Sequence, residues 1–423
     1  MIILVLVIML GLILLGMPVA FALGLSSVFY IVVEGHDLSM VTQSLVRGVD
    51  SFTLLAVPFF LLVGSLMNSG GITDQIIRMA KVLVGHFKGG LGQVNIVASL
   101  IFSGISGSAT ADTVALGSVL IPAMEKEGYD KKFAAALTAV SSIVGPIIPP
   151  SITLIIFGII TGQPIGPLLI AGIIPGVLIA ISLMVYTYFV AAKRGYPSYP
   201  RADFREARSA FGAGIPAVML PVIIVVGIVS GIFTPTEAAA IAVLYGIVIG
   251  FFYYKNLTLK GFWTILKDSA YESAKILFII AAATIFAWVV TRARISDVIG
   301  EFIFSFSTDP TVIITLMVVF LLIIGLFMLP SEGIVIFAPI LTPIVMEVGM
   351  DPIHFGVLMV LTLTIGGATP PVGILLYVVQ DIAKVPFGKL VGELMPMYIP
   401  LVIVALMTAY IPWLTLSIVE LFF

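Results

Sequence analysis

Long stretches without a charged residue constrain the fold of this chain more than any other feature. Ten stretches of at least 16 residues contain no Asp, Glu, Lys or Arg, and a helix needs about 20 apolar residues to cross a bilayer. Only 10% of the residues are charged, against about 25% in soluble domains. The sequence therefore predicts an all-α polytopic membrane protein. The stretches are 1–33, 51–73, 89–111, 133–192, 209–236, 238–254, 276–291, 310–331, 352–380 and 394–419.

The composition excludes several classes of function. A formal net charge of −2 leaves no concentrated basic face of the kind that a nucleic-acid binder needs. The chain has no cysteine, and its three histidines are scattered, which disfavours thiolate or histidine metal sites and cysteine nucleophiles. The phosphate-binding motif G-x-x-x-x-G-K-[ST] is absent from the sequence. We therefore expect a protein that is not an enzyme and has no organic cofactor.

Basic residues in loops predict the orientation of the chain in the membrane. The strongest cluster lies in the middle of the sequence, so the linker 193–212 is expected in the cytoplasm. Both chain ends lack Lys and Arg, so both termini are expected on the periplasmic side. Residues 1–192 and 213–423 then each cross the membrane an odd number of times and are inverted relative to each other. The basic cluster is Lys193, Arg194, Arg201, Arg205 and Arg208.

The two halves also match each other in sequence at a constant offset of 221 residues. Apolar identities between membrane segments mean little, but glycine, proline and aspartate positions coincide as well. Inverted repeats are typical of secondary transporters, whose substrate and ion sites lie near the midplane on interrupted helices. The coincident pairs are Gly104 and Gly325, Pro122 and Pro343, Asp130 and Asp351, Gly145 and Gly366, and Pro149-Pro150 and Pro370-Pro371.

Each half contains a polar segment between two short apolar arms. In the first half the arms span 91–122 around the polar residues 103–112, and in the second they span 311–346 around 328–333. Each arm is too short to cross the bilayer alone. Polar backbone is tolerated at membrane depth only where protein or a watery cavity surrounds it. The sequence therefore predicts one re-entrant hairpin in each half.

A second interruption follows each hairpin, at Gly145–Ser151 within a broken helix 133–162 and at Gly366–Gly373 within a broken helix 352–380. Consecutive prolines remove backbone donors and unwind a helix, and the freed carbonyl oxygens suit a hard cation such as Na⁺. One hairpin tip and one break in each half thus predict two Na⁺ sites; the alternative is ordinary proline kinks and glycine packing. The predicted ligands are Ser103, Ser106, Gly145 and Ile148 in the first site and Gly325, Met328, Gly366 and Thr369 in the second.

Charged residues next to membrane stretches are the other candidates. Asp112 either caps the second arm of its hairpin or contacts polar groups of a substrate. Arg292 either snorkels to the interface or clamps a substrate carboxylate, and with Ser106, Ser108 and Asp112 it forms the predicted substrate-binding set. Glu237 is expected to face the N-terminal dipole of a helix.

These motifs together resemble one known family. The segments Ser103–Asp112, Gly145–Pro150, Thr234–Glu237 and Gly366–Pro371 are similar to those of the large membrane subunit of tripartite ATP-independent periplasmic (TRAP) transporters. The likeness extends over essentially the whole chain.

The resemblance implies an elevator-like fold of the ion-transporter superfamily, in which a transport domain with two hairpins moves against a scaffold. It also implies Na⁺-coupled import across the bacterial inner membrane, with a small four-helix membrane subunit and a periplasmic substrate-binding protein as partners. Family substrates are mostly organic acids, and the chain is most similar to the sialic acid type.

Several alternatives stay open at the level of sequence. The substrate of a TRAP transporter can instead be a four-carbon dicarboxylate, and a self-sufficient Na⁺/carboxylate symporter would need no partner. A passive channel would require a continuous polar lining, whereas polarity here is confined to two clusters. A membrane-embedded enzyme would require an acid–base pair, and Asp112 has no histidine or acidic residue near it in the sequence.

Overall fold

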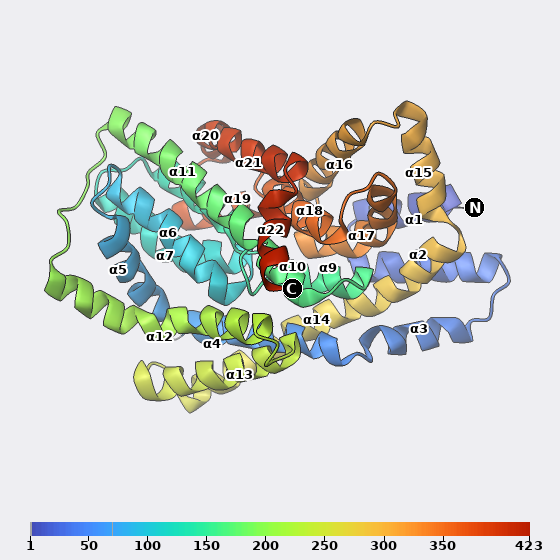
Figure 1. Ribbon diagram of the computed structural model, residues 1–423, viewed down its shortest axis with the longest axis horizontal. Helices are drawn as coiled ribbons and strands as arrows, with labels where there is room; N and C mark the ends of the chain where they lie inside the picture. The colour runs from blue at the N-terminus through green and yellow to red at the C-terminus, as the bar shows by residue number, and fades with distance from the viewer. Residues whose placement is uncertain (1, 70) are drawn as a thin grey trace.

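The computed structural model describes residues 2–69 and 71–423, and all regular elements in these ranges are helices (Figure 1). The first half contains α1 (Ile2–Leu14), α2 (Val19–Val33), α3 (Ser39–Val49), η1 (Phe52–Leu55), α4 (Ala56–Ser69), α5 (Ile72–Val84), α6 (Gly90–Ser106), α7 (Ala109–Lys126), α8 (Lys131–Ser141), η2 (Ser142–Val144), α9 (Ile152–Thr161), α10 (Ile165–Ala171) and α11 (Ile173–Arg194).

The second half contains α12 (Phe204–Val229), α13 (Pro235–Val248), η3 (Ile249–Tyr253), α14 (Leu259–Arg292), α15 (Ile295–Phe306), α16 (Pro310–Gly325), α17 (Pro330–Glu347), α18 (Pro352–Gly367), α19 (Ile374–Ala383), α20 (Phe387–Leu394), η4 (Met395–Met397), α21 (Tyr398–Tyr410) and α22 (Trp413–Phe422).

The helices of the two halves recur at the offset found in the sequence. Adding 221 to the bounds of α7 gives the bounds of α17, and the same shift brings α6 onto α16 and α9 onto α19 within one or two residues. Two helix–turn–helix pairs, α6–α7 and α16–α17, lie where the hairpins are predicted, but their arms are longer than predicted, and α17 is long and apolar enough to cross a membrane. Both proline pairs, Pro149-Pro150 and Pro370-Pro371, have a cis peptide bond.

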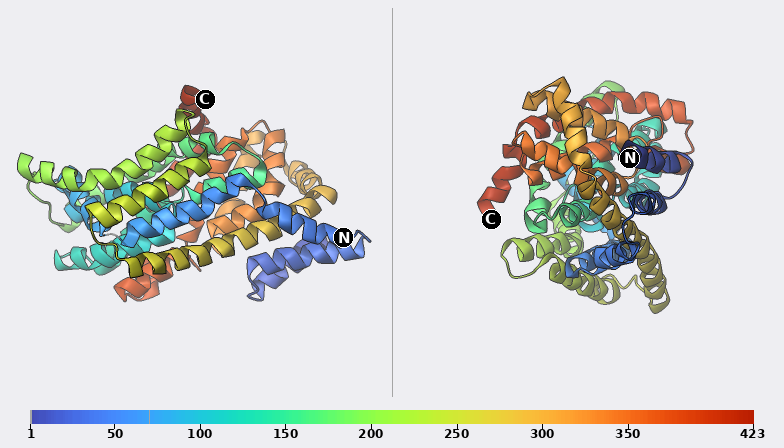
Figure 2. Two further views of the ribbon diagram at one scale, coloured as in Figure 1. Left: turned by 90° about the horizontal axis from the view of Figure 1, so that it is seen from below. Right: turned by 90° about the vertical axis from the view of Figure 1, so that its right-hand side faces the viewer.

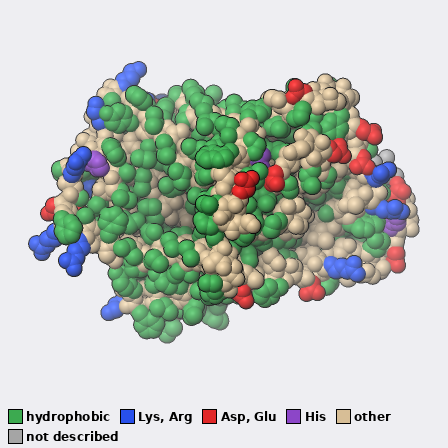
Figure 3. Space-filling model, viewed as in Figure 1, with side chains coloured by type: hydrophobic (Ala, Val, Ile, Leu, Met, Phe, Trp, Pro, Cys, Tyr) green, Lys and Arg blue, Asp and Glu red, His purple; other side chains and the backbone are tan. Residues whose placement is uncertain are grey.

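Charged side chains lie mainly at the two ends of the long axis, and hydrophobic side chains cover most of the surface between them (Figure 3). Six helices in the described ranges are long and apolar enough to cross a membrane, and two bent pairs, α3–α4 and α15–α16, raise that number to eight if each pair is one span. This arrangement agrees with the polytopic membrane protein that the composition predicts.

One face of the molecule is a layer of helices. The helices α4, α12, α13 and α14 lie side by side in this layer, as both the view of Figure 1 and the left view of Figure 2 show. The hairpin helices and the broken helices lie behind the layer, and α18 is buried from His354 to Gly367. The helix that leads into the second break is therefore enclosed by protein, as interrupted backbone at membrane depth would require.

The hairpins and the post-break helices interlock across the two halves. The second arm of the first hairpin, α7, packs against α8 and α19, and the second arm of the second hairpin, α17, packs against α18 and α9. We call the set α6–α9 and α16–α19 the hairpin block. Because each hairpin rests on the broken helix of both halves, the two tips and the two breaks are held close together.

Two segments extend beyond the lengths that charge-free stretches predict. The stretch 276–291 is only the second part of α14, which has 34 residues and is about 51 Å long at 1.5 Å per residue. The interval 193–212 is helical at both ends, since α11 continues to Arg194 and α12 begins at Phe204. Charges do not end a helix, so a charge-free stretch underestimates helix length wherever the helix continues past its apolar part.

Candidate functional site

The tip of the first hairpin is a tight turn between α6 and α7. Gly107 adopts a left-handed conformation with φ 61°, and a Cβ at this position would collide with the carbonyl oxygen of Pro150. The Ser108 side chain caps α7 by accepting a hydrogen bond from Ala111 N. Glycine thus lets the tip of the first hairpin lie directly against the first break.

Asp112 is fully buried in the first turns of α7. One of its carboxylate oxygens accepts a hydrogen bond from Ser106 Oγ, and the other, Oδ2, has no hydrogen-bond partner within the described part of the chain. A Cβ added to Gly145 would lie 2.6 Å from this Oδ2 and 3.1 Å from the carbonyl carbon of Ser108. The structure therefore brings Ser106, Asp112 and Gly145 together. Ser108, rather than Asp112, supplies the helix cap.

The other two predicted ligands of the first site, Ser103 and Ile148, have contacts of their own. Ser103 is fully buried, and its hydroxyl donates to Leu100 O over 2.7 Å. Ile148 is half-buried, and its side chain fills the space beside Gly176 of α11, where a Cβ would lie 2.5 Å from it. Only the backbone carbonyl of Ile148 can serve as a cation ligand, because its side chain is hydrocarbon.

The second predicted site is built on contact between two helix backbones. A Cβ on Gly366 would lie 2.6 Å from the Cα of Gly325, so neither position has room for a side chain. Thr369 N donates to Gly366 O over 2.7 Å, and Thr369 Oγ1 donates to Ile365 O over 2.7 Å. The end of α16 and the second break are thus in direct contact, and Met328 is buried in the segment that follows α16.

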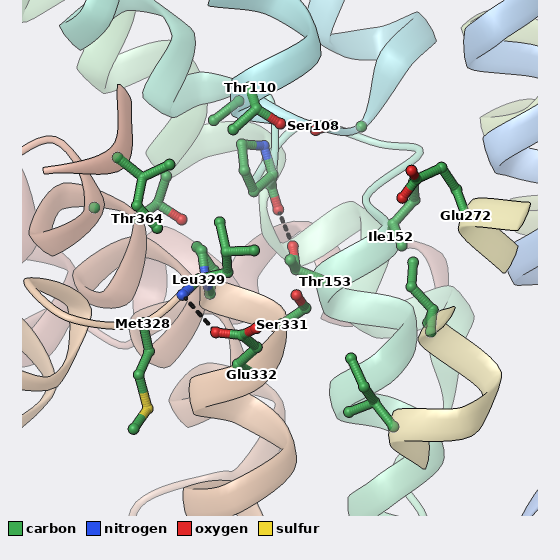
Figure 4. Close-up of a pocket in the computed structure, with 18 of the residues that line it drawn as sticks. Ser108, Thr110, Ile152, Thr153, Glu272, Met328, Leu329, Ser331, Glu332 and Thr364 are labelled. Atoms are coloured by element: carbon green, nitrogen blue, oxygen red, sulfur yellow. Dashed lines mark hydrogen bonds between the residues drawn. The ribbon is translucent and has the colours of Figure 1, made fainter. Parts of the chain in front are cut away.

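A cavity of about 380 Å³ lies between these two regions. Both hairpin tips and both breaks contribute to its wall, together with one face of α14. Figure 4 shows Ser108 and Thr110 on one side, the segment from Met328 to Glu332 on another, and Glu272 of α14 across from them. The volume falls within the range of about 300–1,000 Å³ that is usual for small-molecule sites.

The structure places only part of the predicted substrate-binding set at this cavity. Ser108 lines it, whereas Ser106 and Asp112 lie behind the tip and are absent from the lining. Arg292 is exposed at the end of α14, 13 residues beyond the lining residue Ile279. That separation is about 20 Å along the helix, so the structure does not bring Arg292 to the cavity.

Several polar lining residues were not among the predicted site residues. Thr110, Ser331 and Thr364 belong to the tips and to α18, and Thr153 donates to Pro146 O over 2.9 Å within the first break. The tip residues sit inside the polar segments that the sequence marks. The face of α14 gives no such local signal, because its place beside the cavity depends on tertiary packing. This face consists of Glu272, Lys275, Ile276 and Ile279.

Two other glutamates have structural partners. Glu237 forms a capping box with Thr234 at the start of α13, which confirms its predicted place at a helix N-terminus. Glu332 accepts a hydrogen bond from Leu329 N over 3.2 Å at the start of α17 and also lines the cavity. Both carboxylates stabilise the N-terminal end of a helix dipole.

Comparison with known proteins places the chain in a family. Residues 6–414 match the family "Tripartite ATP-independent periplasmic transporter, DctM component". The sialic acid TRAP transporter large permease protein SiaM of Vibrio cholerae is 44% identical over 98% of this chain and 97% of its own length. The C4-dicarboxylate TRAP transporter large permease protein DctM of Rhodobacter capsulatus is 35% identical over 97% of each chain.

A solved structure supports the fold as well. The crystal structure of the Alcanivorax borkumensis YdaH transporter superposes with a TM-score of 0.65 over 90% of this chain and 89% of that chain, at 14% sequence identity. At this identity the likeness concerns the fold alone. The family match and the full-length relatives together lead to one conclusion: the chain belongs to the DctM component family of tripartite ATP-independent periplasmic transporters.

Proposed function

We propose that this chain is the Na⁺-coupled permease of a TRAP transporter that imports an organic acid, with sialic acid as the favoured substrate. The cavity enclosed by both hairpin tips and both breaks is the observation that carries the proposal. The similarity to SiaM over nearly the full length of both chains favours sialic acid. A periplasmic substrate-binding protein would deliver the acid, and a small four-helix subunit would complete the membrane part.

The donor chemistry supports Na⁺ as the coupling ion. Each candidate site combines a hairpin tip with unwound backbone, whose carbonyl oxygens suit a hard cation. At the first site Asp112 Oδ2, which has no partner among the described residues, adds a carboxyl oxygen beside Gly145. We propose Ser103, Ser106, Gly145 and Ile148 as ligands of one Na⁺, and Gly325, Met328, Gly366 and Thr369 as ligands of the other.

The layout of the helices supports an elevator motion. The hairpin block is held together by contacts of α7 with α19 and of α17 with α9. The helix layer contacts this block mainly through α4, α12 and α14, at α6 and α17. In the proposed motion the block moves with its substrate and ions past the layer, and residues 1–192 and 213–423 act as inverted repeats.

The energetics suit a gradient-driven pump. A tenfold Na⁺ gradient supplies about 1.4 kcal/mol for each ion, and a potential of 100 mV adds about 2.3 kcal/mol for each net charge. Two Na⁺ ions that move with one monoanion would therefore yield about 5 kcal/mol, which corresponds to a several-thousandfold accumulation. No ATP hydrolysis is needed for such a gradient.

We place the chain in the bacterial inner membrane, with the basic residues around 193–208 in the cytoplasm and both termini in the periplasm. The positive-inside rule supports this orientation. Attachment of a protease site or a fluorescent reporter at either terminus would test it.

The direct test is uptake into proteoliposomes that contain this chain and its small subunit, with the binding protein outside. Uptake of radiolabelled sialic acid that requires both an inward Na⁺ gradient and the binding protein is the expected result. Uptake without the binding protein would instead indicate a self-sufficient symporter. Uptake driven only by the substrate's own gradient, at equal rates in Na⁺ and K⁺, would indicate a channel.

A four-carbon dicarboxylate is the second candidate substrate, because the DctM relative is similar over almost its entire length. Radiolabelled succinate in the same assay decides between the two acids. Uptake of succinate in preference to sialic acid would leave the coupling mechanism in place and replace the substrate.

A further inference from the structure

The face of α14 that borders the cavity carries two opposite charges. Its lining residues Glu272, Lys275, Ile276 and Ile279 follow the spacing i, i+3, i+4, i+7, which places them on one side of a helix. Lys275 Nζ donates to Glu272 Oε1 over 2.6 Å, and about half of each side chain is exposed. Lys275 also lies over the ring of Tyr271, with its Nζ 4.8 Å from the ring centroid.

Lys275 is the one basic residue in the wall of this cavity within the described part of the chain. The remaining charged residues of the wall are Glu272 and Glu332. Because Glu332 accepts from Leu329 N at the start of α17, its carboxylate is engaged in the tip. A carboxylate that enters the cavity thus has a single ammonium group available to it.

The pair contributes little to the stability of the helix itself. An ion pair one turn apart adds only a small stabilisation, and both side chains are about half exposed, where such pairs are worth little. Both residues precede the charge-free stretch 276–291 of α14. What distinguishes the pair from the other charges of α14 is its place in the cavity wall.

We infer that Lys275 is the substrate-carboxylate receptor of this transporter, and that Glu272 is its exchangeable partner while the cavity is empty of substrate. An organic anion displaces the Glu272 carboxylate from the Lys275 ammonium, so the pair is neutral before substrate enters and its ammonium then becomes free to bind the anion. The inference rests on the proposed function, since it names the residue that selects an anionic substrate. Because α14 belongs to the helix layer, Lys275 would bind the carboxylate before the block moves with its substrate in the proposed motion.

The absence of cysteine from the chain allows a test that does not depend on transport. Ile279→Cys places one thiol on the same face, one turn beyond Lys275. The variant, in complex with its small subunit in lipid nanodiscs, is treated with an anionic reagent, 2-sulfonatoethyl methanethiosulfonate, or a cationic one, 2-(trimethylammonium)ethyl methanethiosulfonate. Mass spectrometry of this chain measures each labelling rate.

The ratio of the labelling rate with the anionic reagent to that with the cationic reagent is expected to fall several-fold when Lys275→Gln is added to Ile279→Cys. Without the Lys275 ammonium, the concentration of the anionic reagent near the thiol is lower. Glu272→Gln is expected to raise the same ratio. Lys267→Gln is the matched control: it removes a lysine from the same helix that lies over Trp263 with Nζ 5.8 Å from the ring centroid but does not line the cavity. Equal ratios with and without Lys275→Gln would overturn the inference.

Protection by substrate gives the second readout. The sialic acid concentration that halves labelling of Ile279→Cys is expected to rise about tenfold with Lys275→Gln, as for loss of one charge-assisted hydrogen bond. Lys275→Arg should restore most of the protection, and the Na⁺ concentration for half-maximal protection should not change. If neither sialic acid nor succinate protects the thiol, the proposed substrates are wrong, while the labelling ratio still decides the role of Lys275. A shift in Na⁺ dependence equal to the shift for sialic acid would make Lys275 a structural residue.

Discussion

At the scale of single residues, the first candidate Na⁺ site depends on a glycine beside a buried carboxylate. Asp112 Oδ2 has no partner within the described residues, and the place where a Cβ of Gly145 would stand is 2.6 Å from it. A buried carboxyl oxygen without a hydrogen-bond partner is costly, and a bound cation would offset that cost. Glycine at position 145 therefore leaves the space beside Asp112 Oδ2 free of a side chain.

Gly145→Ala is expected to weaken Na⁺ activation of uptake at least tenfold, because the added methyl group would occupy the space beside Asp112. Overpacking of a full site costs about 1–3 kcal/mol, so the variant should still fold. The measurement is the Na⁺ concentration for half-maximal sialic acid uptake. Gly212→Ala is the control, since a Cβ there meets nothing within 4 Å. Unchanged Na⁺ activation in Gly145→Ala would remove Gly145 from the site.

The sequence predicts the small residues of the site better than the charged ones. A proline removes a backbone hydrogen-bond donor, and a glycine leaves space where a side chain would stand. Both effects depend on the residue itself, so the sequence shows them at Gly145, Gly366 and the proline pairs. Glu272 and Lys275 precede the charge-free stretch 276–291, and nothing local shows that α14 continues through them to reach the cavity. Arg292, the expected carboxylate clamp, lies about 20 Å from the lining residue Ile279 along the helix.

At the scale of elements, each hairpin tip is positioned by its contact with a break. Gly107 combines a left-handed backbone conformation with close approach to Pro150. Because Gly107 packs against the first break, the break determines where α7 begins. Ser108, at the start of α7, lines the cavity. The tip is therefore packed directly against the first break.

Gly107→Ala is expected to abolish uptake, whereas Gly162→Ala should only lower stability. Both glycines have positive φ, 61° and 70°, so both variants incur about 1 kcal/mol of backbone strain. A Cβ on Gly162 meets nothing within 4 Å, whereas one on Gly107 meets Pro150. The thermal unfolding temperature of each variant measures the effect of backbone strain, and sialic acid uptake measures the effect of displacing the tip. Equal uptake in the two variants would show that tip position does not matter.

At the scale of the whole molecule, the repeat was predictable and the interlocking was not. Matching glycine, proline and aspartate positions at one offset reveal the repeat, because these residues determine breaks and turns. The contacts of α7 with α19 and of α17 with α9 join segments far apart in the sequence and depend on side-chain packing of apolar helices. A helix that is apolar on every face does not show in its sequence which other helix it packs against.

Coupled transport requires that Na⁺ and substrate move together through this chain. The most direct measurement is simultaneous uptake of radioactive Na⁺ and labelled sialic acid into proteoliposomes that hold the complex, with binding protein outside. Na⁺ is expected to enter only with substrate and in a constant ratio of about two, one ion for each tip–break site. Substrate entry at the same rate with no accompanying Na⁺ entry would contradict it.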